Sequence, residues 1–174
     1  METDEDFYVR DVKVVARELL GFFLCSYDKQ WKVVRSMIRE TEAYDGEQDL
    51  ACHASKGKTV RTSVMYEQGG RWYVYLCYGM HWMLNIVTGK EGYPAAVLIR
   101  GVSGFYGPGR LTKGLGVNGS LNGKTQGKAS SLWIESSTSR ERILTGPRIG
   151  VDYAGFEWSQ KPYRFWFSND QLMK

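Results

Sequence analysis

A strand-forming run at residues 33–38 leads directly into the acidic and aromatic segment 39–45, Arg-Glu-Thr-Glu-Ala-Tyr-Asp. Side chains alternate between the two faces of a β-strand, so we expect Glu40 and Glu42 to share one face. The pattern predicts a rigid strand that ends with at least one carboxylate beside the ring of Tyr44. Two carboxylates in one partly buried site do not ionise equally easily, and one can then serve as a base near neutral pH. Neighbouring glutamates are more often solvated surface charges, so the assignment depends on the rest of the chain.

Aromatic residues make up 14% of the 174 residues, which is the main departure from an ordinary composition. Aromatic side chains favour β-strands, and nucleic-acid bases stack on them. Hydrophobic residues at 43% and charged residues at 24% are typical of a globular protein, and the length suits one hydrophobic core. The 20 glycines indicate many turns. We therefore predict one strand-dominated α+β domain that spans residues 1–174.

The net charge of +4 and a pI near 8.9 fit a polyanionic partner without proving one. Cys25, Cys52 and Cys77 show no Cys-x-x-Cys spacing, so they predict neither a disulfide framework nor a zinc ribbon. Residues 1–6 are acidic, and no window approaches about 18 uninterrupted apolar residues. We expect a soluble intracellular protein, in the cytoplasm or nucleoid of a prokaryote or in the nucleus of a eukaryote.

Hydrophobic spacing and turn residues predict the order of the elements. Apolar residues at 12, 15, 16, 19 and 20 have the spacing of an amphipathic helix, with Asp11 as its N-cap and Gly21 at its end. A short helix is expected near Arg110, and its first NH groups beside Arg110 and Lys113 would suit a phosphate. Strands are expected at 22–26, 31–38, 71–78, 81–87, 95–100, 131–135, 148–151 and 163–167, with long loops at 45–68 and 116–131.

A tyrosine-rich strand provides the second part of the candidate site. Tyr73 and Tyr75 would share one face of the strand, whereas Tyr78 falls at the turn, where an aromatic ring is exposed. Core packing is the better interpretation for Tyr73 alone. Tyr75, together with Tyr44 and His53, suggests a box of aromatic faces around a planar ligand.

These blocks, in this order, resemble the alkyladenine DNA glycosylase family, the 3-methyladenine DNA glycosylases of the vertebrate and Bacillus type. Several blocks in register over nearly the whole chain make chance agreement improbable. The matching blocks are Glu-Thr-Glu-Ala-Tyr at 40–44, His53, Tyr-Val-Tyr-x-x-Tyr-Gly-Met at 73–80, Asn85, Val-Leu-Ile-Arg at 97–100, Gly-Pro at 107–108, Pro-Arg-Ile-Gly-Val at 147–151 and Lys-Pro-Tyr-Arg-Phe at 161–165.

The resemblance implies a single domain with a curved, open-barrel-like antiparallel sheet and peripheral helices. Such an enzyme acts as a monomer on double-stranded DNA, flips out an alkylated or deaminated purine and hydrolyses its N-glycosidic bond without a cofactor. It leaves an abasic site and does not cleave the strand as a lyase. By position, the resemblance makes Glu42 the general base that activates water, and Arg100 the residue that holds this water and the carboxylate. The flipped purine would lie between Tyr44, His53 and Tyr75, and Asn85 would exclude guanine. Tyr78 would be the wedge in the duplex, and the DNA backbone would be contacted by Met80, Arg110 and Lys113.

Two other functions are compatible with parts of the sequence. A non-catalytic nucleic-acid-binding module of the same fold could use the same aromatic and basic surface. A metal-dependent nuclease is the less favoured alternative, and it should fail in chelator and cut the DNA backbone. The carboxylates that could collect Mg²⁺ in such an enzyme are Glu40, Glu42, Asp45, Glu47 and Asp49.

Overall fold

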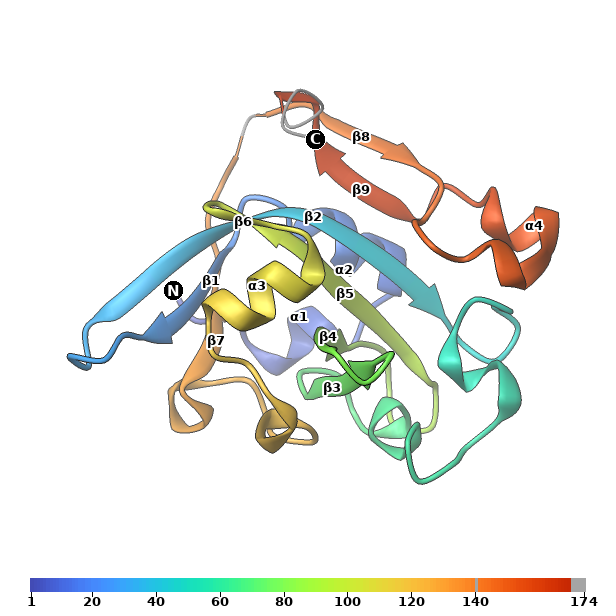
Figure 1. Cartoon of the computed structure of the whole chain (residues 1–174), viewed down its shortest axis with the longest axis horizontal. Coiled ribbons are helices and arrows are strands. Elements are labelled where there is room, and N and C mark those ends of the chain that lie inside the picture. Colours follow the sequence, from blue (N-terminus) through green and yellow to red (C-terminus); the bar gives the residue numbers. More distant parts are fainter. Residues whose placement is uncertain (140, 170–174) are drawn as a thin grey trace.

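The computed structural model describes residues 1–139 and 141–169, which form an antiparallel sheet of nine strands with short helices around it (Figure 1). The main path runs β3-β4-β5-β2-β1-β7 and does not close on itself, while β6 pairs with β5, and β9 pairs with both β2 and β8. The prediction of a strand-dominated α+β fold is confirmed. The strands are β1 (Phe23–Tyr27), β2 (Val33–Asp45), β3 (Trp72–Cys77), β4 (His81–Val87), β5 (Ala95–Val102), β6 (Phe105–Tyr106), β7 (Leu132–Glu135), β8 (Ile143–Gly146) and β9 (Arg164–Phe167).

Within the described residues, four short α-helices and five 3₁₀ helices connect or flank these strands. The N-cap prediction is confirmed, because the Asp11 carboxylate accepts hydrogen bonds from the backbone NH groups of Lys13 and Val14. The helices are α1 (Glu5–Tyr8), α2 (Val12–Glu18), α3 (Pro108–Gly114) and α4 (Gly155–Ser159), and the 3₁₀ helices are η1 (His53–Lys56), η2 (Ser63–Tyr66), η3 (Gly119–Leu121), η4 (Lys128–Ser130) and η5 (Asp152–Ala154).

Strand β2 is the longest element, and it organises the sheet. Its first half pairs with β1, and its second half pairs with β5 and β9. We predicted a strand over residues 31–38 that leads into the acidic segment, and this boundary was wrong, because β2 continues to Asp45. Because β5 supplies partners as far as Asp45, both Glu40 and Glu42 lie inside a strand that is paired on both sides.

The two faces of β2 have different surroundings. On one face, the Thr41 hydroxyl is buried and donates to the Ala16 carbonyl of α2 at 2.8 Å, on the side of the main hydrophobic core. The carboxylates of Glu40 and Glu42 lie on the other face, where both contact Arg100 of β5. The predicted alternation is therefore confirmed, and it keeps the carboxylates away from the apolar core.

The predicted strand at 148–151 is wrong. The Arg148 side chain is buried against Asp49, and the backbone NH of Ile149 donates to a side chain of β2. Since this NH is used in that way, the segment forms a bend and continues into η5. Strands β6 and β8 and helices α1 and α4 were not predicted.

The predicted loop at 45–68 lies outside the strands from residue 46 onward, and its residues are packed against the rest of the fold. Its residues Ala54 and Met65 are buried in a cluster with Tyr73. Ala51 packs on Val151 and Ala154, so this loop meets the segment that leads into α4 at one end of the sheet (Figure 1). The three cysteines are free. Among the described helices, none is long and apolar enough to cross a membrane.

Candidate active site

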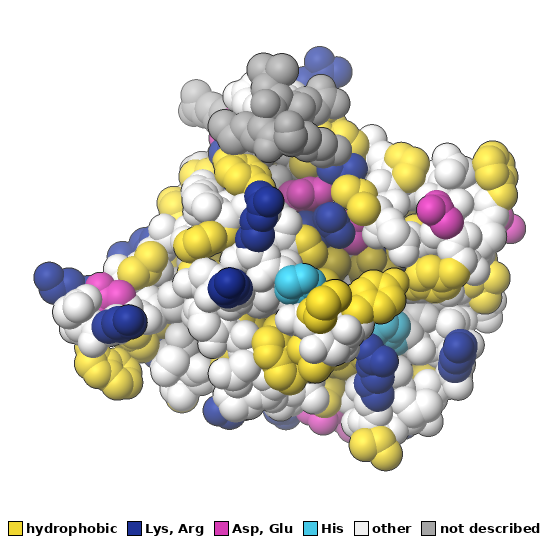
Figure 2. All heavy atoms as spheres, viewed as in Figure 1, with side chains coloured by type: hydrophobic (Ala, Val, Ile, Leu, Met, Phe, Trp, Pro, Cys, Tyr) yellow, Lys and Arg dark blue, Asp and Glu magenta, His cyan; other side chains and the backbone are white. Residues whose placement is uncertain are grey.

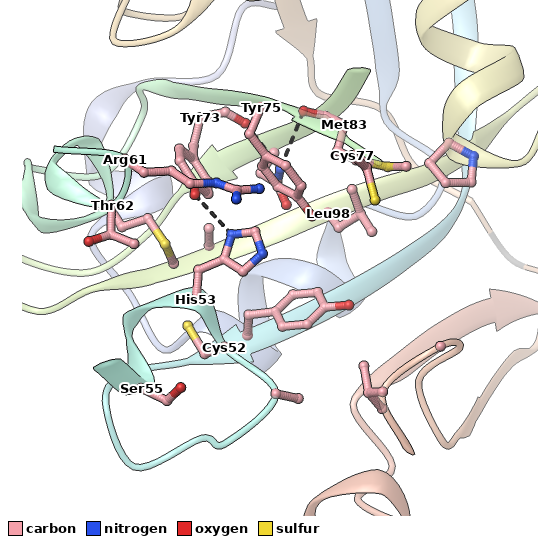
Figure 3. A pocket seen from close by; sticks show the side chains of 18 of the residues that line it. Cys52, His53, Ser55, Arg61, Thr62, Tyr73, Tyr75, Cys77, Met83 and Leu98 are labelled. Carbon is pink, nitrogen blue, oxygen red and sulfur yellow. Dashed lines mark hydrogen bonds between the residues drawn. The ribbon is translucent and has the colours of Figure 1, made fainter. Parts of the chain in front are cut away.

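A pocket of about 1030 Å³ opens between the loop at 45–68, strands β3 to β5 and the segment that follows β8 (Figure 3). This volume is at the upper end of the usual range for ligand sites. Residues far apart in the sequence meet here because β2, β3, β4 and β5 are neighbours in one sheet. The predicted site residues that line the pocket are Tyr44, His53, Tyr75, Tyr78, Asn85 and Arg100.

Three rings form one wall of the pocket. Figure 3 shows His53, Tyr73 and Tyr75 turned toward one another. The ring centroids are 4.5 Å apart for His53 and Tyr75 and 5.4 Å apart for Tyr73 and Tyr75. Tyr73 is buried, as predicted, and its hydroxyl lies 2.9 Å from Nδ1 of His53. Burial, with a smaller contribution from the Arg61 charge, lowers the pKa of His53 to about 4. The imidazole is therefore neutral at pH 7.

Two other side chains of the pocket are fixed by hydrogen bonds. The Tyr44 hydroxyl donates to Oε2 of Glu42 at 2.9 Å, and the Arg148 guanidinium lies over the Tyr44 ring at 4.8 Å. Asn85 is buried on β4, and its side-chain amide donates to the Tyr73 carbonyl at 3.0 Å. Both residues present a fixed shape to the pocket.

Glu42 lies beneath this pocket with no exposed surface. Its Oε1 accepts from the Ile149 backbone NH at 2.7 Å, and its Oε2 accepts from Tyr44 and from Nη1 of Arg100, the latter at 3.4 Å. Burial raises the pKa of Glu42, while Arg100, the Ile149 NH and the Tyr44 hydroxyl oppose the rise. The carboxylate is thus more basic than an exposed glutamate, and three hydrogen-bond donors face its two oxygens.

A buried ion pair supports the pocket from below. The Arg148 and Asp49 side chains have no exposed surface and form two hydrogen bonds, of 2.5 Å and 2.8 Å. Arg148 also donates to the Ala43 carbonyl of β2 at 2.8 Å. The pair therefore connects the loop at 45–68, β2 and the segment after β8. We did not assign either residue to the site from sequence, although Arg148 falls in the Pro-Arg-Ile-Gly-Val block.

The carboxylates considered as magnesium ligands point to different partners. Asp45 accepts from Lys13 at 2.6 Å, Glu47 accepts from the Tyr66 hydroxyl at 2.6 Å, and Asp49 pairs with Arg148. Across residues 1–139 and 141–169, His, Cys, Asp and Glu form no group of three or more that could hold a metal ion.

The surface around the pocket mouth combines apolar and basic side chains (Figure 2). Tyr78 is 90% exposed and Met80 is 70% exposed, both in the turn between β3 and β4. Arg110 and Lys113 are exposed on α3, which begins at Pro108 near the predicted start. Helix α3 is held against β4, because the Thr112 hydroxyl donates to the Trp82 carbonyl at 2.9 Å. The structure therefore brings these basic side chains close to the exposed turn.

Comparison with known proteins gives a consistent result. The sequence profile of the methylpurine-DNA glycosylase family matches residues 6–106 and 103–171. Similar proteins, each named "Putative 3-methyladenine DNA glycosylase", occur in Myxococcus xanthus, with 45% identity over 96% of this chain and 90% of the relative, and in Methanocella arvoryzae, with 43% identity over 94% and 91%. A protein of the same name in Psychrobacter cryohalolentis is 42% identical over 86% of this chain and 84% of its own length.

The Arg148–Asp49 pair generates a prediction about stability. Replacing Asp49 by Asn leaves a buried guanidinium without its counter-charge, so the free energy of unfolding should fall by about 3 to 5 kcal/mol. Urea unfolding followed by tryptophan fluorescence measures this change. Glu18→Gln, which removes a carboxylate from the exposed pair with Arg10, is the control and should change stability little. Equal unfolding midpoints for Asp49→Asn and the parent protein would contradict the prediction.

Proposed function

The chain belongs to the methylpurine-DNA glycosylase family, and from this we propose how it removes damaged purines from duplex DNA. The enzyme flips the damaged nucleotide out of the double helix, binds the base in the pocket, and hydrolyses the N-glycosidic bond with a water activated by Glu42. The products are a free purine and an abasic site, and the strand is not cleaved. The enzyme works as a monomer and without a cofactor.

The observation that carries this proposal is a fully buried carboxylate of raised pKa directly beneath an aromatic pocket. A carboxylate of this kind is suited to general-base catalysis, because its basicity is raised toward the working pH. In the proposed reaction, water attacks the anomeric carbon of the deoxyribose and transfers a proton to Glu42. The electrons of the glycosidic bond leave with the purine. Arg100 holds the water and the Glu42 carboxylate in place.

The pocket suits a flat and electron-poor ligand. Tyr44, His53 and Tyr75 would stack against the two faces of the base, and stacking is worth about 1 to 3 kcal/mol per base. This offsets much of the cost of unstacking and unpairing, which is lowest for a damaged base. Since His53 is neutral at pH 7, it does not repel a positively charged alkylpurine, and the tyrosine rings attract it. The fixed Asn85 amide would crowd the amino group of guanine.

The exposed turn is suited to the duplex itself. Tyr78 would enter the space that the flipped nucleotide leaves, and its insertion would hold that nucleotide outside the helix. Met80, Arg110 and Lys113 would contact the DNA backbone beside it, where the two cations neutralise phosphates.

The first test of this function is Glu42→Gln. The amide cannot take a proton from water, so single-turnover release of the base should fall by about 10² to 10⁴-fold, while binding of lesion DNA is retained. The assay uses duplexes that contain 3-methyladenine, hypoxanthine or ethenoadenine, with and without chelator. Near-parental base release by Glu42→Gln would refute the assignment, and chelator-sensitive strand cutting by the parent protein would indicate a nuclease.

The pH dependence of the parent protein tests the same assignment. A general base acts as the anion, which exists above its pKa, and burial raises the pKa of Glu42 above the ordinary 4.5. Base release should therefore decline on acidification through a pKa higher than that of an exposed glutamate. The acid limb should be absent from the residual rate of Glu42→Gln. An acid limb that persists unchanged in this variant would assign the titration to another group.

Tyr78→Ala tests the wedge. The variant should lower the flipping equilibrium and the affinity for lesion DNA, whereas Glu42→Gln should preserve both. The fluorescence of ethenoadenine reports its unstacking on mixing with each protein. Trp31→Ala is a matched control, because Trp31 is also an exposed aromatic with positive φ, in the turn between β1 and β2. If Tyr78→Ala flips the base as well as the parent protein does, the wedge is another residue, and His81 or Trp82 is the next candidate.

Arg110 and Lys113 generate a prediction about salt. Replacing either by Gln should weaken binding of damaged and undamaged duplex alike and reduce the slope of log affinity against log salt by about one unit. Lys29→Gln, in the turn between β1 and β2, is the control and should leave the slope unchanged. Unchanged slopes for both variants would place the phosphate contacts elsewhere, with the exposed Lys56, Lys58 and Arg61 as the alternative.

A further inference from the structure

Glu40 forms the centre of a row of alternating charges that ends at Glu42. Its Oε1 accepts hydrogen bonds from Nε of Arg100 at 3.2 Å and from Nε of Arg164 at 2.5 Å. Arg100 in turn reaches Glu42 through Nη1. The order is thus Arg164, Glu40, Arg100 and Glu42, with charges of plus, minus, plus and minus. None of the four side chains is more than 16% exposed, so solvent screens these contacts little.

The backbone explains why Glu40 reaches both arginines. The pairing of β2 with β5 shifts in register on both sides of Glu40, as in a β-bulge, and Glu40 lies opposite both Gly101 of β5 and Trp166 of β9. At this point β2 has left β1 and has β5 and β9 as its neighbours. Arg164 is held from its other side as well, because its guanidinium lies over the Trp166 ring at 4.5 Å. The Glu40 carboxylate is therefore held in one position, between Arg100 and Arg164.

The Arg100 guanidinium has only a long contact to Glu42, 3.4 Å from Nη1 to Oε2. The length of this contact depends on which residue binds Nε, on the other side of the Arg100 guanidinium. Glu40 holds Nε, so Nη1 is directed at Glu42. If Arg100 were not held in this way, it could form a closer, bidentate pair with Glu42, which would make this carboxylate a weaker base.

We propose that Glu40 is the positioning residue of this site: it fixes Arg100 at a distance from Glu42 and offsets part of its charge, which preserves the basicity of Glu42. The inference rests on the proposed function of Glu42 as the general base. Glu40 itself does not touch the reacting atoms. Its negative charge also opposes ionisation of Glu42 directly.

The other groups that face Glu42 do not replace this effect. Tyr44 from β2 and the Ile149 NH donate hydrogen bonds to it, which favours the anion. Arg148 adds positive charge from the segment after β8, although Asp49 pairs with it. Among the described carboxylates, Glu40 is thus the one besides Glu42 that pairs with Arg100.

Glu40→Gln tests the proposal, because the amide keeps an oxygen for the arginines but removes the charge. Single-turnover base release should fall by about tenfold to a hundredfold, since small displacements of catalytic groups have effects of this size. Lesion-DNA binding should be retained. The acid limb of the pH–rate profile should move to lower pH, because Arg100 then favours the Glu42 anion more strongly. A structural role alone would not move this limb.

Two further variants make the experiment decisive. Glu141→Gln removes the carboxylate that pairs with Arg39, the neighbour of Glu40 on β2. This control variant should keep the parental rate and pH profile. Glu40→Asp keeps the charge but shortens the side chain, so it holds Arg100 less well. It should lose rate, and its acid limb should move to lower pH by less than that of Glu40→Gln. It also serves as the second variant if Glu40→Gln does not fold.

Parental rate and pH profile in a folded Glu40→Gln would overturn the proposal, and so would a loss of rate with an unmoved acid limb. If only Glu40→Asp folds, a parental rate in that variant would overturn it. Failure of the proposed function would differ from these outcomes, because the parent protein itself would then release no base.

Discussion

A carboxylate buried inside a sheet is costly unless hydrogen bonds and opposite charge compensate it, and much of this structure follows from the compensation of Glu42. Its partners come from three parts of the chain: Tyr44 on β2, Arg100 on β5 and the Ile149 NH after β8. Because these partners must meet at one point, the second half of β2, β5 and the segment after β8 are fixed relative to one another. The compensation is incomplete, because burial still raises the pKa of Glu42, and the mechanism that we propose uses this basicity.

The same requirement explains which parts of the fold could be predicted from sequence. Elements whose pattern reflects burial on one face were predicted closely, such as α2 with its Asp11 cap and the tyrosine-rich strand β3. The segment 148–151 has the composition of a strand, and it fails as one because Arg148 and the Ile149 NH serve Asp49 and Glu42 instead. Such long-range contacts leave no periodic signal in the sequence.

The candidate site shows a similar division. Glu42, Tyr44, His53, Tyr75, Asn85 and Arg100 could be proposed from motifs, because the family resemblance fixes their order. The groups that support them could not, since Asp49 looked like a possible metal ligand and Glu40 like a second candidate base. The sequence shows two glutamates of similar surroundings, and only the structure distinguishes the one paired with two arginines from the one that is fully buried.

The turn between β3 and β4 differs from the pocket, because its aromatic side chain is exposed and its backbone conformation is unfavourable. Met80 N donates to the Cys77 carbonyl, and the central residues Tyr78 and Gly79 both have positive φ, at 49° and 69°. Glycine adopts this conformation readily, but a bulky residue such as tyrosine does not, and a sparsely populated conformation costs about 1 to 3 kcal/mol. Because the Tyr78 side chain is 90% exposed, it contributes little packing to the isolated protein that could offset this backbone cost. Base stacking inside an opened duplex supplies a favourable contact of similar size, so this turn suits the wedge role that we propose for Tyr78.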